Sequence, residues 1–184
     1  MPRLYLVRHG RAEAGFGESM DPGLDEKGQR QAEVAAARLV PLGPLPILTS
    51  PLRRTRETAV PLAQLWKREP AVEKAVAEIP SPEGMTLEGR IGWLRELMAG
   101  VWSGAAPDLT AWRDSVIAAL AARTEDTVIF SHFVAINVAA GAALGDDRVV
   151  VFSPDNCSVT VFDVSDGVLT LVEKGHEAEL TKVR

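Results

Sequence analysis

Leu4-Tyr5-Leu6-Val7-Arg8-His9-Gly10 is an apolar run that ends in two basic side chains and a glycine. A short apolar run of this kind predicts a buried strand, and open α/β sheets place their chemistry just beyond the carboxyl ends of such strands. A neutral imidazole there can attack phosphorus, and the guanidinium beside it can hold phosphoryl oxygens through its fixed fork of donors. His9 and Arg8 are therefore the first candidates for a phosphoryl-transfer site.

A second basic cluster follows the short apolar segment Pro46-Ile47-Leu48, within Ser50-Pro51-Leu52-Arg53-Arg54-Thr55-Arg56-Glu57-Thr58-Ala59. Ser50 is a favoured N-cap and Pro51 a favoured first helical residue, so a helix is predicted over Pro51–Lys67. Arginines in its first turn would lie beside unpaired backbone N–H groups at the positive end of the helix dipole, which suits a phosphate. The alternative is an ordinary surface helix in which Arg53 and Glu57 pair at i, i+4.

A third candidate is His132, which ends the apolar segment Thr127-Val128-Ile129-Phe130-Ser131-His132. The chain has three histidines, and two of them thus follow predicted strands. A lone histidine at such a place is more often a hydrogen-bonded structural residue than a catalytic one. The joint presence of His9, Arg54 and His132 favours a shared site instead.

The order of apolar runs along the chain predicts an α/β fold, a three-layer α/β/α sandwich with a mostly parallel central sheet. Strands are expected at residues 3–8, 46–49, 72–77, 127–131, 148–153, 158–164 and 168–173. Helices are expected over 26–40, 51–67, 86–98, 108–122 and 135–144. Asp166-Gly167 between two alternating runs predicts a hairpin, because a type I′ turn needs positive φ at both central residues.

Composition indicates an ordinary globular protein forming one domain over residues 1–184, with 46% hydrophobic and 24% charged residues. A net charge of −5 argues against nucleic-acid binding, which usually needs a basic surface. No apolar run is long enough to cross a bilayer, and Met1-Pro2-Arg3 leads directly into the first strand without a signal peptide, so a cytoplasmic location and no membrane partner are expected. The single cysteine, Cys157, is expected to be a buried thiol. Oligomeric state stays open.

The three segments together resemble the histidine phosphatases, the superfamily that includes cofactor-dependent phosphoglycerate mutases and many phosphomonoesterases. The family's Arg-His-Gly matches residues 8–10, and its late strand ending in histidine matches residues 128–132. Its Ser-x-Leu-x-Arg-Ala-x-x-Thr-Ala matches residues 50–59, with Thr55 where the family has alanine. The segment 21–32 resembles the family's usual approach to its first helix, and the resemblance spans residues 3–160. It implies a phosphoglycerate mutase-like fold.

The resemblance also implies roles for individual residues. His9 would become phosphohistidine, while Arg8, Arg54 and His132 surround the phosphoryl oxygens, where charge is spread in the transition state. The family places a carboxylic acid after its third strand, and Glu78 is the best match here, with Glu73 and Glu83 as rivals. In this cycle two in-line displacements need no metal and no cofactor, because the guanidiniums and imidazole supply the positive charge.

Departures from the family pattern shape the functional expectation. Arg11-Ala12 stand where many relatives have Glu-Thr, so the loop from Glu13 to Asp21 would line the entrance differently. Arg11 is a candidate contact for a second anionic group of the substrate, or simply an exposed arginine. Residues 79–112 are expected to form a cap over the pocket, with Trp102 as a candidate substrate contact.

Compared with the mutases, the chain is shorter and lacks their insertion after the acid residue. We therefore expect a phosphatase acting on a small phosphomonoester. The alternatives are a phosphohistidine protein phosphatase, a mutase-type phosphotransferase, or a phosphate-binding module without catalysis.

Overall fold

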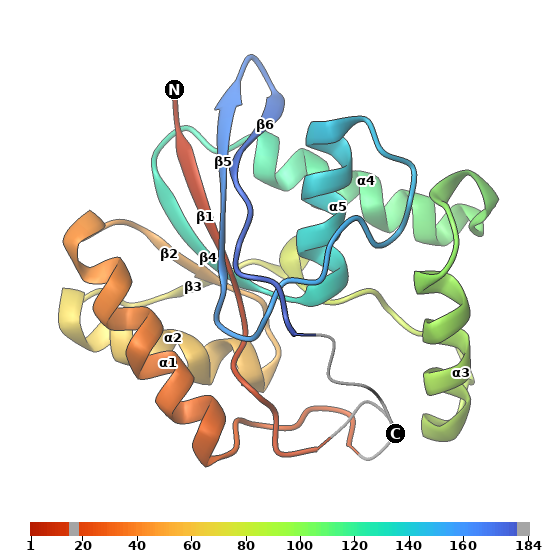
Figure 1. The fold of residues 1–184 in the computed structure, drawn as a ribbon, viewed down its shortest axis with the longest axis horizontal. Helices are drawn as coiled ribbons and strands as arrows, with labels where there is room; N and C mark the ends of the chain where they lie inside the picture. Colours follow the sequence, from red (N-terminus) through yellow and green to blue (C-terminus); the bar gives the residue numbers. More distant parts are fainter. Residues whose placement is uncertain (15–18, 180–184) are drawn as a thin grey trace.

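The computed structural model describes residues 1–14 and 19–179, and six strands in these residues form one mixed, mostly parallel sheet (Figure 1). The sheet order is β3-β2-β4-β1-β5-β6. The strands β3, β2, β4 and β1 pair in parallel, whereas β5 pairs antiparallel with both β1 and β6. Their bounds are β1 Arg3–Arg8, β2 Ile47–Thr49, β3 Ala71–Val72, β4 Thr127–Ser131, β5 Val159–Ser165 and β6 Val168–Glu173.

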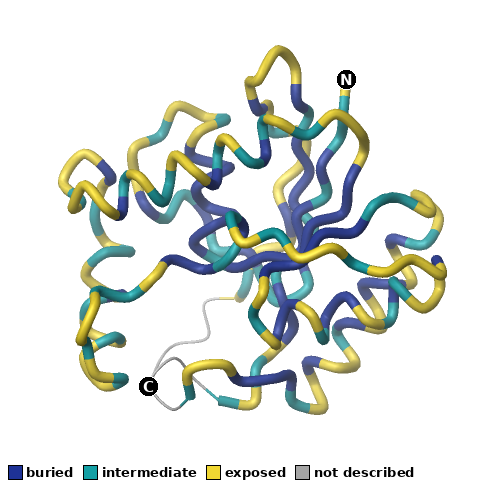
Figure 2. The backbone as a smooth tube through the Cα atoms, turned by 180° about the vertical axis from the view of Figure 1, so that it is seen from behind, coloured by how far each residue is buried: buried dark blue, intermediate teal, exposed yellow. Residues whose placement is uncertain are grey.

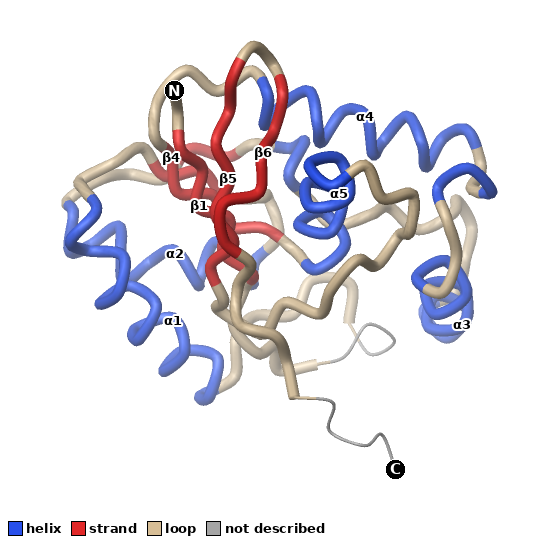
Figure 3. The backbone as a smooth tube through the Cα atoms, turned by 45° about the horizontal axis from the view of Figure 1, so that its top comes forward, coloured by secondary structure: helices blue, strands red, loops and turns tan. Residues whose placement is uncertain are grey.

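Helices cover both faces of the sheet, which gives the expected α/β/α layers (Figure 3). α1 (Glu26–Leu39) and α2 (Arg53–Trp66) pack together on one face, and α4 (Pro107–Ala121) and α5 (Phe133–Leu144) pack together on the other. α3 (Leu87–Met98) lies at the outer side of the second pair. Three short 3₁₀ helices complete the described elements: η1 Val40–Leu42, η2 Lys74–Val76 and η3 Trp102–Gly104.

The two faces of the sheet carry separate apolar cores because successive side chains of a strand point to opposite faces. In β1, Leu4 and Leu6 join the core shared with α4 and α5, whereas Val7 joins the core shared with α1 and α2. The central strands are therefore buried on both sides, as the dark strands in Figure 2 show. Burial on both faces is typical of parallel sheets and explains the continuous apolar runs in the sequence.

The backbone confirms the predicted hairpin and shows why a glycine follows His9. Asp166 and Gly167 have φ values of 50° and 74° between β5 and β6, the positive angles that the hairpin turn requires. Gly10 follows β1 where the chain passes close to the start of α1, and a Cβ at Gly10 would lie 2.6 Å from the carbonyl oxygen of Gly28. The glycine after His9 thus permits a contact that no larger residue could make.

The strand predicted at 148–153 is wrong. This segment forms no ladder, because the side-chain carbonyl of Asn137 in α5 accepts hydrogen bonds from the backbone N–H groups of Val151 and Phe152 at 2.7 and 3.1 Å. A buried amide thus takes the place of a neighbouring strand. Within the described residues, no helix combines the length and the apolar character needed to cross a membrane.

The strand predicted at 72–77 shortens to β3 and is followed by η2. Glu73 causes this change, since its carboxylate accepts from the backbone N–H of Ala75 at 3.0 Å and caps the turn. The helix predicted from Pro51 begins instead at Arg53, with Leu52 as its N-cap. Ser50 lies two residues before this N-cap, where its Oγ accepts from the backbone N–H of Leu52 at 3.2 Å and bonds to the ring of His132 at 2.7 Å.

Candidate active site

Two histidines meet at the carboxyl edge of the sheet because β1 and β4 are parallel neighbours in register. Arg8 pairs with Ser131, so the next residues, His9 and His132, leave the sheet side by side. Their ring centroids lie 5.2 Å apart, and both rings are buried. The predicted convergence of these residues from distant parts of the sequence is thus present in the structure.

His9 is held so that one ring nitrogen is unprotonated. Nδ1 lies 2.8 Å from the carbonyl oxygen of Gly10. A carbonyl only accepts, so Nδ1 carries the proton and Nε2 carries a lone pair. Burial, together with the positive charges of Arg54 and Arg8, lowers the pKa of His9 to about 3. The imidazole is therefore neutral at physiological pH, as nucleophilic attack requires.

Two guanidiniums, the buried one of Arg54 and the half-buried one of Arg8, face the same place. Arg54 lies in the first turn of α2, and its Nε donates to Nε2 of His9 at 3.2 Å. Arg8 ends β1, donates through Nη1 to the carbonyl oxygen of Pro154 at 2.9 Å, and stacks over the ring of Phe133. Burial lowers the pKa of both arginines, yet a guanidinium stays charged at neutral pH. Positive charge is thus concentrated around Nε2 of His9.

Glu78 places a buried carboxyl group on the wall of this cavity, which Glu13 also lines. It is only 8% exposed, and its oxygens accept from the backbone N–H groups of Ile79 at 3.1 Å and Val134 at 3.2 Å. Burial raises the pKa of Glu78, while these two hydrogen bonds and the charges of Arg54 and Arg8 act in the opposite direction. A raised pKa favours the protonated carboxylic acid that a general acid must be.

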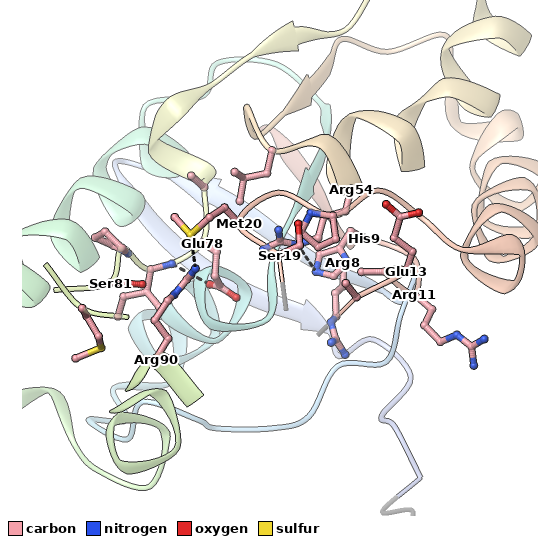
Figure 4. A pocket seen from close by; sticks show the side chains of 18 of the residues that line it. Arg8, His9, Arg11, Glu13, Ser19, Met20, Arg54, Glu78, Ser81 and Arg90 are labelled. Atoms are coloured by element: carbon pink, nitrogen blue, oxygen red, sulfur yellow. Dashed lines mark hydrogen bonds between the residues drawn. The ribbon is translucent and has the colours of Figure 1, made fainter. Parts of the chain in front are cut away.

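The rival carboxylates lie elsewhere. Glu73 caps η2, and the exposed Glu83 does not line the cavity. Of these three candidates, the structure brings only Glu78 to His9 and Arg54 (Figure 4). The cavity has a volume of about 640 Å³. Among the described residues, no cluster of three or more histidine, cysteine, aspartate or glutamate side chains is arranged to hold a metal ion.

A family model described as the histidine phosphatase superfamily (branch 1) matches residues 4–176. The chain belongs to the histidine phosphatase superfamily. Among curated relatives, the probable phosphoglycerate mutase GpmB of Salmonella arizonae is 31% identical over 164 residues, covering 79% of this chain and 76% of that protein. The GpmB protein of Cronobacter sakazakii is 36% identical over 118 residues, 58% of this chain and 54% of its own length, so this match spans about half of that relative.

Solved structures with the same fold are more distant in sequence. Bacillus stearothermophilus YhfR gives a TM-score of 0.79 at 20% identity and covers 97% of this histidine phosphatase and 98% of its own chain. A phosphoserine phosphatase of Entamoeba histolytica, solved with 3-phosphoglyceric acid, gives 0.76 at 22% identity, with coverage of 96% and 98%. These likenesses establish a phosphoglycerate mutase-like α/β fold for this family member.

The expected substrate contact at Trp102 is wrong. Trp102 is 3% exposed, packs with Trp112 at 6.2 Å between ring centroids, and does not line the cavity. The short helix η3 turns the indole of Trp102 into the core. From the expected cap over 79–112, the residues that line the cavity lie within 79–90.

Arg11 does line the cavity, although its Nε is paired with Asp25. Sequence reasoning missed Arg90 of α3, which also lines the cavity and lies beside Glu78 in Figure 4. An arginine on an amphipathic helix is usually a solvent-facing residue, so only the packing of α3 reveals it. It also missed Asn156, whose amide donates to the backbone carbonyl of His9 at 3.0 Å. Residues 15–18, within the loop expected to shape the entrance, lie outside the described residues.

Cys157 is half-buried rather than buried. Burial raises the pKa of its thiol to about 12, which disfavours the reactive thiolate. Its backbone N–H donates to the carbonyl oxygen of Arg8 at 2.9 Å. The contribution of Cys157 to the site is thus structural.

Proposed function

We propose that this chain is a metal-independent phosphatase that hydrolyses a small phosphomonoester through a phosphohistidine on His9, with Glu78 as general acid and base. The observation that carries the proposal is the contact between Nε2 of His9 and Nε of Arg54 at 3.2 Å. It combines an unprotonated nucleophile with a cation positioned for phosphoryl oxygens, in a cavity that also contains a protonatable carboxyl group.

In the first displacement, Nε2 of His9 attacks phosphorus and the P–O bond to the alcohol breaks. Glu78 gives its proton to the departing oxygen, which would otherwise leave as an alkoxide. Arg8 and Arg54 stabilise the charge spread over the phosphoryl oxygens in the transition state. Their fixed positions in β1 and α2 mean that little reorganisation is needed.

In the second displacement, water attacks the phosphohistidine. The Glu78 carboxylate takes one proton from that water, the N–P bond breaks, and His9 returns to its neutral state with a lone pair on Nε2. Inorganic phosphate then leaves, and Glu78 is protonated for the next cycle. The charge supplied by a metal ion in other phosphoryl-transfer enzymes is supplied here by the two guanidiniums.

The short connection between Glu78 and α3 favours hydrolysis over phosphoryl transfer between substrates. Residues 79–86 cross directly from the acid to the helix and include Pro80 and Pro82. A mutase must protect its phosphohistidine from water, and this segment offers little cover. The names of the curated relatives favour the mutase as the second candidate.

The proposed substrate is small and carries a second anionic group. The outer cavity wall combines apolar residues, among them Met20 and Met85, with the guanidiniums of Arg11 and Arg90. A carboxylate or second phosphate would be attracted to these cations. A phosphohistidine protein substrate is less favoured, because imidazole is a good leaving group and would not need the proton of Glu78.

The test is hydrolysis of small phosphomonoesters in excess chelator, with phosphate release measured beside transfer between the positions of a phosphoglycerate. We expect phosphate release that chelator does not reduce, no activity for His9→Ala, and transfer much slower than hydrolysis. Transfer faster than hydrolysis would assign the mutase function instead. Loss of activity on chelation would show that a metal is needed.

A further inference from the structure

A line of buried hydroxyl groups connects the second histidine to the backbone of α2. Nε2 of His132 lies 2.7 Å from Oγ of Ser50, and this oxygen lies 2.8 Å from Oγ1 of Thr55. Oγ1 of Thr55 in turn donates to the carbonyl oxygen of Leu52 at 2.8 Å. The side chains of His132, Ser50 and Thr55 are all inaccessible to solvent. The protons of this line are therefore distributed by the protein alone.

The carbonyls at the end of the line set its direction. Oγ1 of Thr55 faces two carbonyl oxygens, that of Leu52 at 2.8 Å and that of Ser50 at 3.2 Å, and carbonyls only accept. The single hydroxyl proton of Thr55 is therefore directed to a carbonyl, and Thr55 accepts the hydroxyl proton of Ser50. Ser50 then has no proton for His132 and must accept one from Nε2. If Ser50 instead donated its proton to Nε2, the ring proton of His132 would sit on Nδ1. Nδ1 is buried and has no hydrogen-bond partner among the described residues. Buried N–H groups without an acceptor are rare and costly.

We propose that Thr55, acting through Ser50, is a positioning residue that keeps the proton of His132 on Nε2 and leaves Nδ1 as the nitrogen available to the phosphoryl group. The inference rests on the proposed function and on the expectation from the family resemblance that His132, whose ring centroid lies 5.2 Å from that of His9, contacts that group. With Nε2 committed to Ser50, Nδ1 of a neutral His132 can only accept a hydrogen bond, and after taking up a proton it can donate one. Ser50 continues to accept from Nε2 in both states of the ring.

Thr55 is a departure of this chain from the family motif. The family motif has alanine at this position, which offers Ser50 no hydroxyl acceptor. Without Thr55, the Ser50 hydroxyl is free to rotate and donate to Nε2, which would move the ring proton to Nδ1. The presence of alanine in the motif also indicates that Thr55→Ala is compatible with the fold.

The direct test is the tautomer of His132, measured by nitrogen NMR on protein labelled at histidine. The chain has three histidines, so His9→Asn and His176→Asn assign the remaining signals. In the wild type we expect Nε2 of His132 to give the signal of a protonated nitrogen and Nδ1 that of an unprotonated one. Thr55→Val, which removes the hydroxyl at constant shape, and Thr55→Ala should shift the population towards a proton on Nδ1. Thr55→Ser, which keeps the hydroxyl, should behave as wild type.

Kinetics supply the second readout. A neutral hydrogen bond contributes about 1 kcal/mol, so kcat/KM of Thr55→Val should fall about fivefold, with Thr55→Ser close to wild type. The proposal is overturned if wild-type His132 carries its proton on Nδ1, or if Thr55→Val leaves the tautomer unchanged. Absence of phosphatase activity in the wild type would instead refute the proposed function, and the NMR result would still decide the role of Thr55.

Discussion

Nε of Arg54 lies 3.2 Å from Nε2 of His9, although the two residues are 45 positions apart in the chain. The first turn of α2 carries the arginine and the end of β1 carries the histidine. Thr58, one turn further along α2, reinforces this contact, because its hydroxyl accepts from the backbone N–H of Gly10 at 3.0 Å. The proposed nucleophile and its neighbouring cation are therefore fixed to each other by side chain and backbone.

Replacing Arg54 should remove stabilisation of the transition state more than substrate binding. Loss of one preorganised donor to a developing charge typically lowers kcat by about 10²- to 10³-fold, and we expect Arg54→Gln to fall in this range. Arg56→Gln is the matched control, because Arg56 is exposed on the same helix. The measurement is kcat of both variants with para-nitrophenyl phosphate. Equal effects of the two substitutions would refute the role of Arg54.

Glu78→Gln should show an effect that depends on the leaving group. For an alkyl phosphate we expect kcat/KM to fall by about 10²- to 10⁴-fold, the usual contribution of general acid catalysis. The fall should be smaller for para-nitrophenyl phosphate, whose leaving group hardly needs a proton. Glu83→Gln, an exposed carboxylate nearby, serves as the control.

The pH profile gives an independent check on Glu78. Its pKa is raised by burial, and the acid must be protonated for the first displacement. Activity on alkyl phosphates should therefore fall as pH rises through the pKa of Glu78, and this basic limb should be missing in Glu78→Gln. A basic limb that persists unchanged in the variant would assign the titration to another group.

His9 should make the folded protein less stable in mild acid. Its pKa is about 3 in the folded state and 6.5 in the unfolded chain, so between these values the unfolded chain binds the extra proton. Stability is then lost as pH falls below about 6.5, and His9 alone accounts for about 2 kcal/mol of loss by pH 5. The buried His132 acts in the same direction, while the raised pKa of Glu78 acts in the opposite one.

Urea unfolding at pH 7.5 and pH 5 measures this contribution. The difference in unfolding free energy between the two pH values should shrink by about 2 kcal/mol in His9→Asn. His176→Asn is the control, because His176 is exposed. The same pH dependence in wild type and His9→Asn would show that His9 is not held neutral by its surroundings.

Arg90 should influence substrate choice rather than chemistry. It lines the cavity from α3, whereas His9 and His132 follow the ends of β1 and β4. We expect Arg90→Gln to raise KM about tenfold for a phosphomonoester with a carboxylate, in line with the loss of one charge-assisted hydrogen bond. KM for para-nitrophenyl phosphate, which has no second anion, should change little. Equal changes for both substrates would argue against a second-anion contact.

The centre of the fold was predictable because its signals are local. The apolar runs that end at Arg8 and Ser131 indicate buried parallel strands, and the parallel arrangement brings the residues that follow them to one edge. The turn at Asp166-Gly167 was equally clear, since few residue pairs accept two positive φ angles.

The errors arise where a distant side chain decides local structure. Asn137 takes the hydrogen bonds that a strand at 148–153 would have made with a neighbour. Ser50, expected to cap α2, lies before the N-cap Leu52 and bonds to the ring of His132. Trp102 is drawn into the core by Trp112 and by Arg113, which stacks over its ring at 5.7 Å. No pattern within a short stretch of sequence contains these pairings.

Trapping the covalent intermediate tests the central claim most directly. Glu78→Gln should accumulate phosphoenzyme with para-nitrophenyl phosphate, because the first displacement proceeds and the attack of water is slowed. After denaturing quench, we predict phosphate that is stable in alkali, labile in acid, and located on His9 by mass spectrometry. The phosphoenzyme should be absent from the double variant Glu78→Gln/His9→Ala. It should be retained in Glu78→Gln/His176→Ala, because His176 is exposed. Turnover without a phosphoenzyme, or phosphate on another residue, would contradict the account.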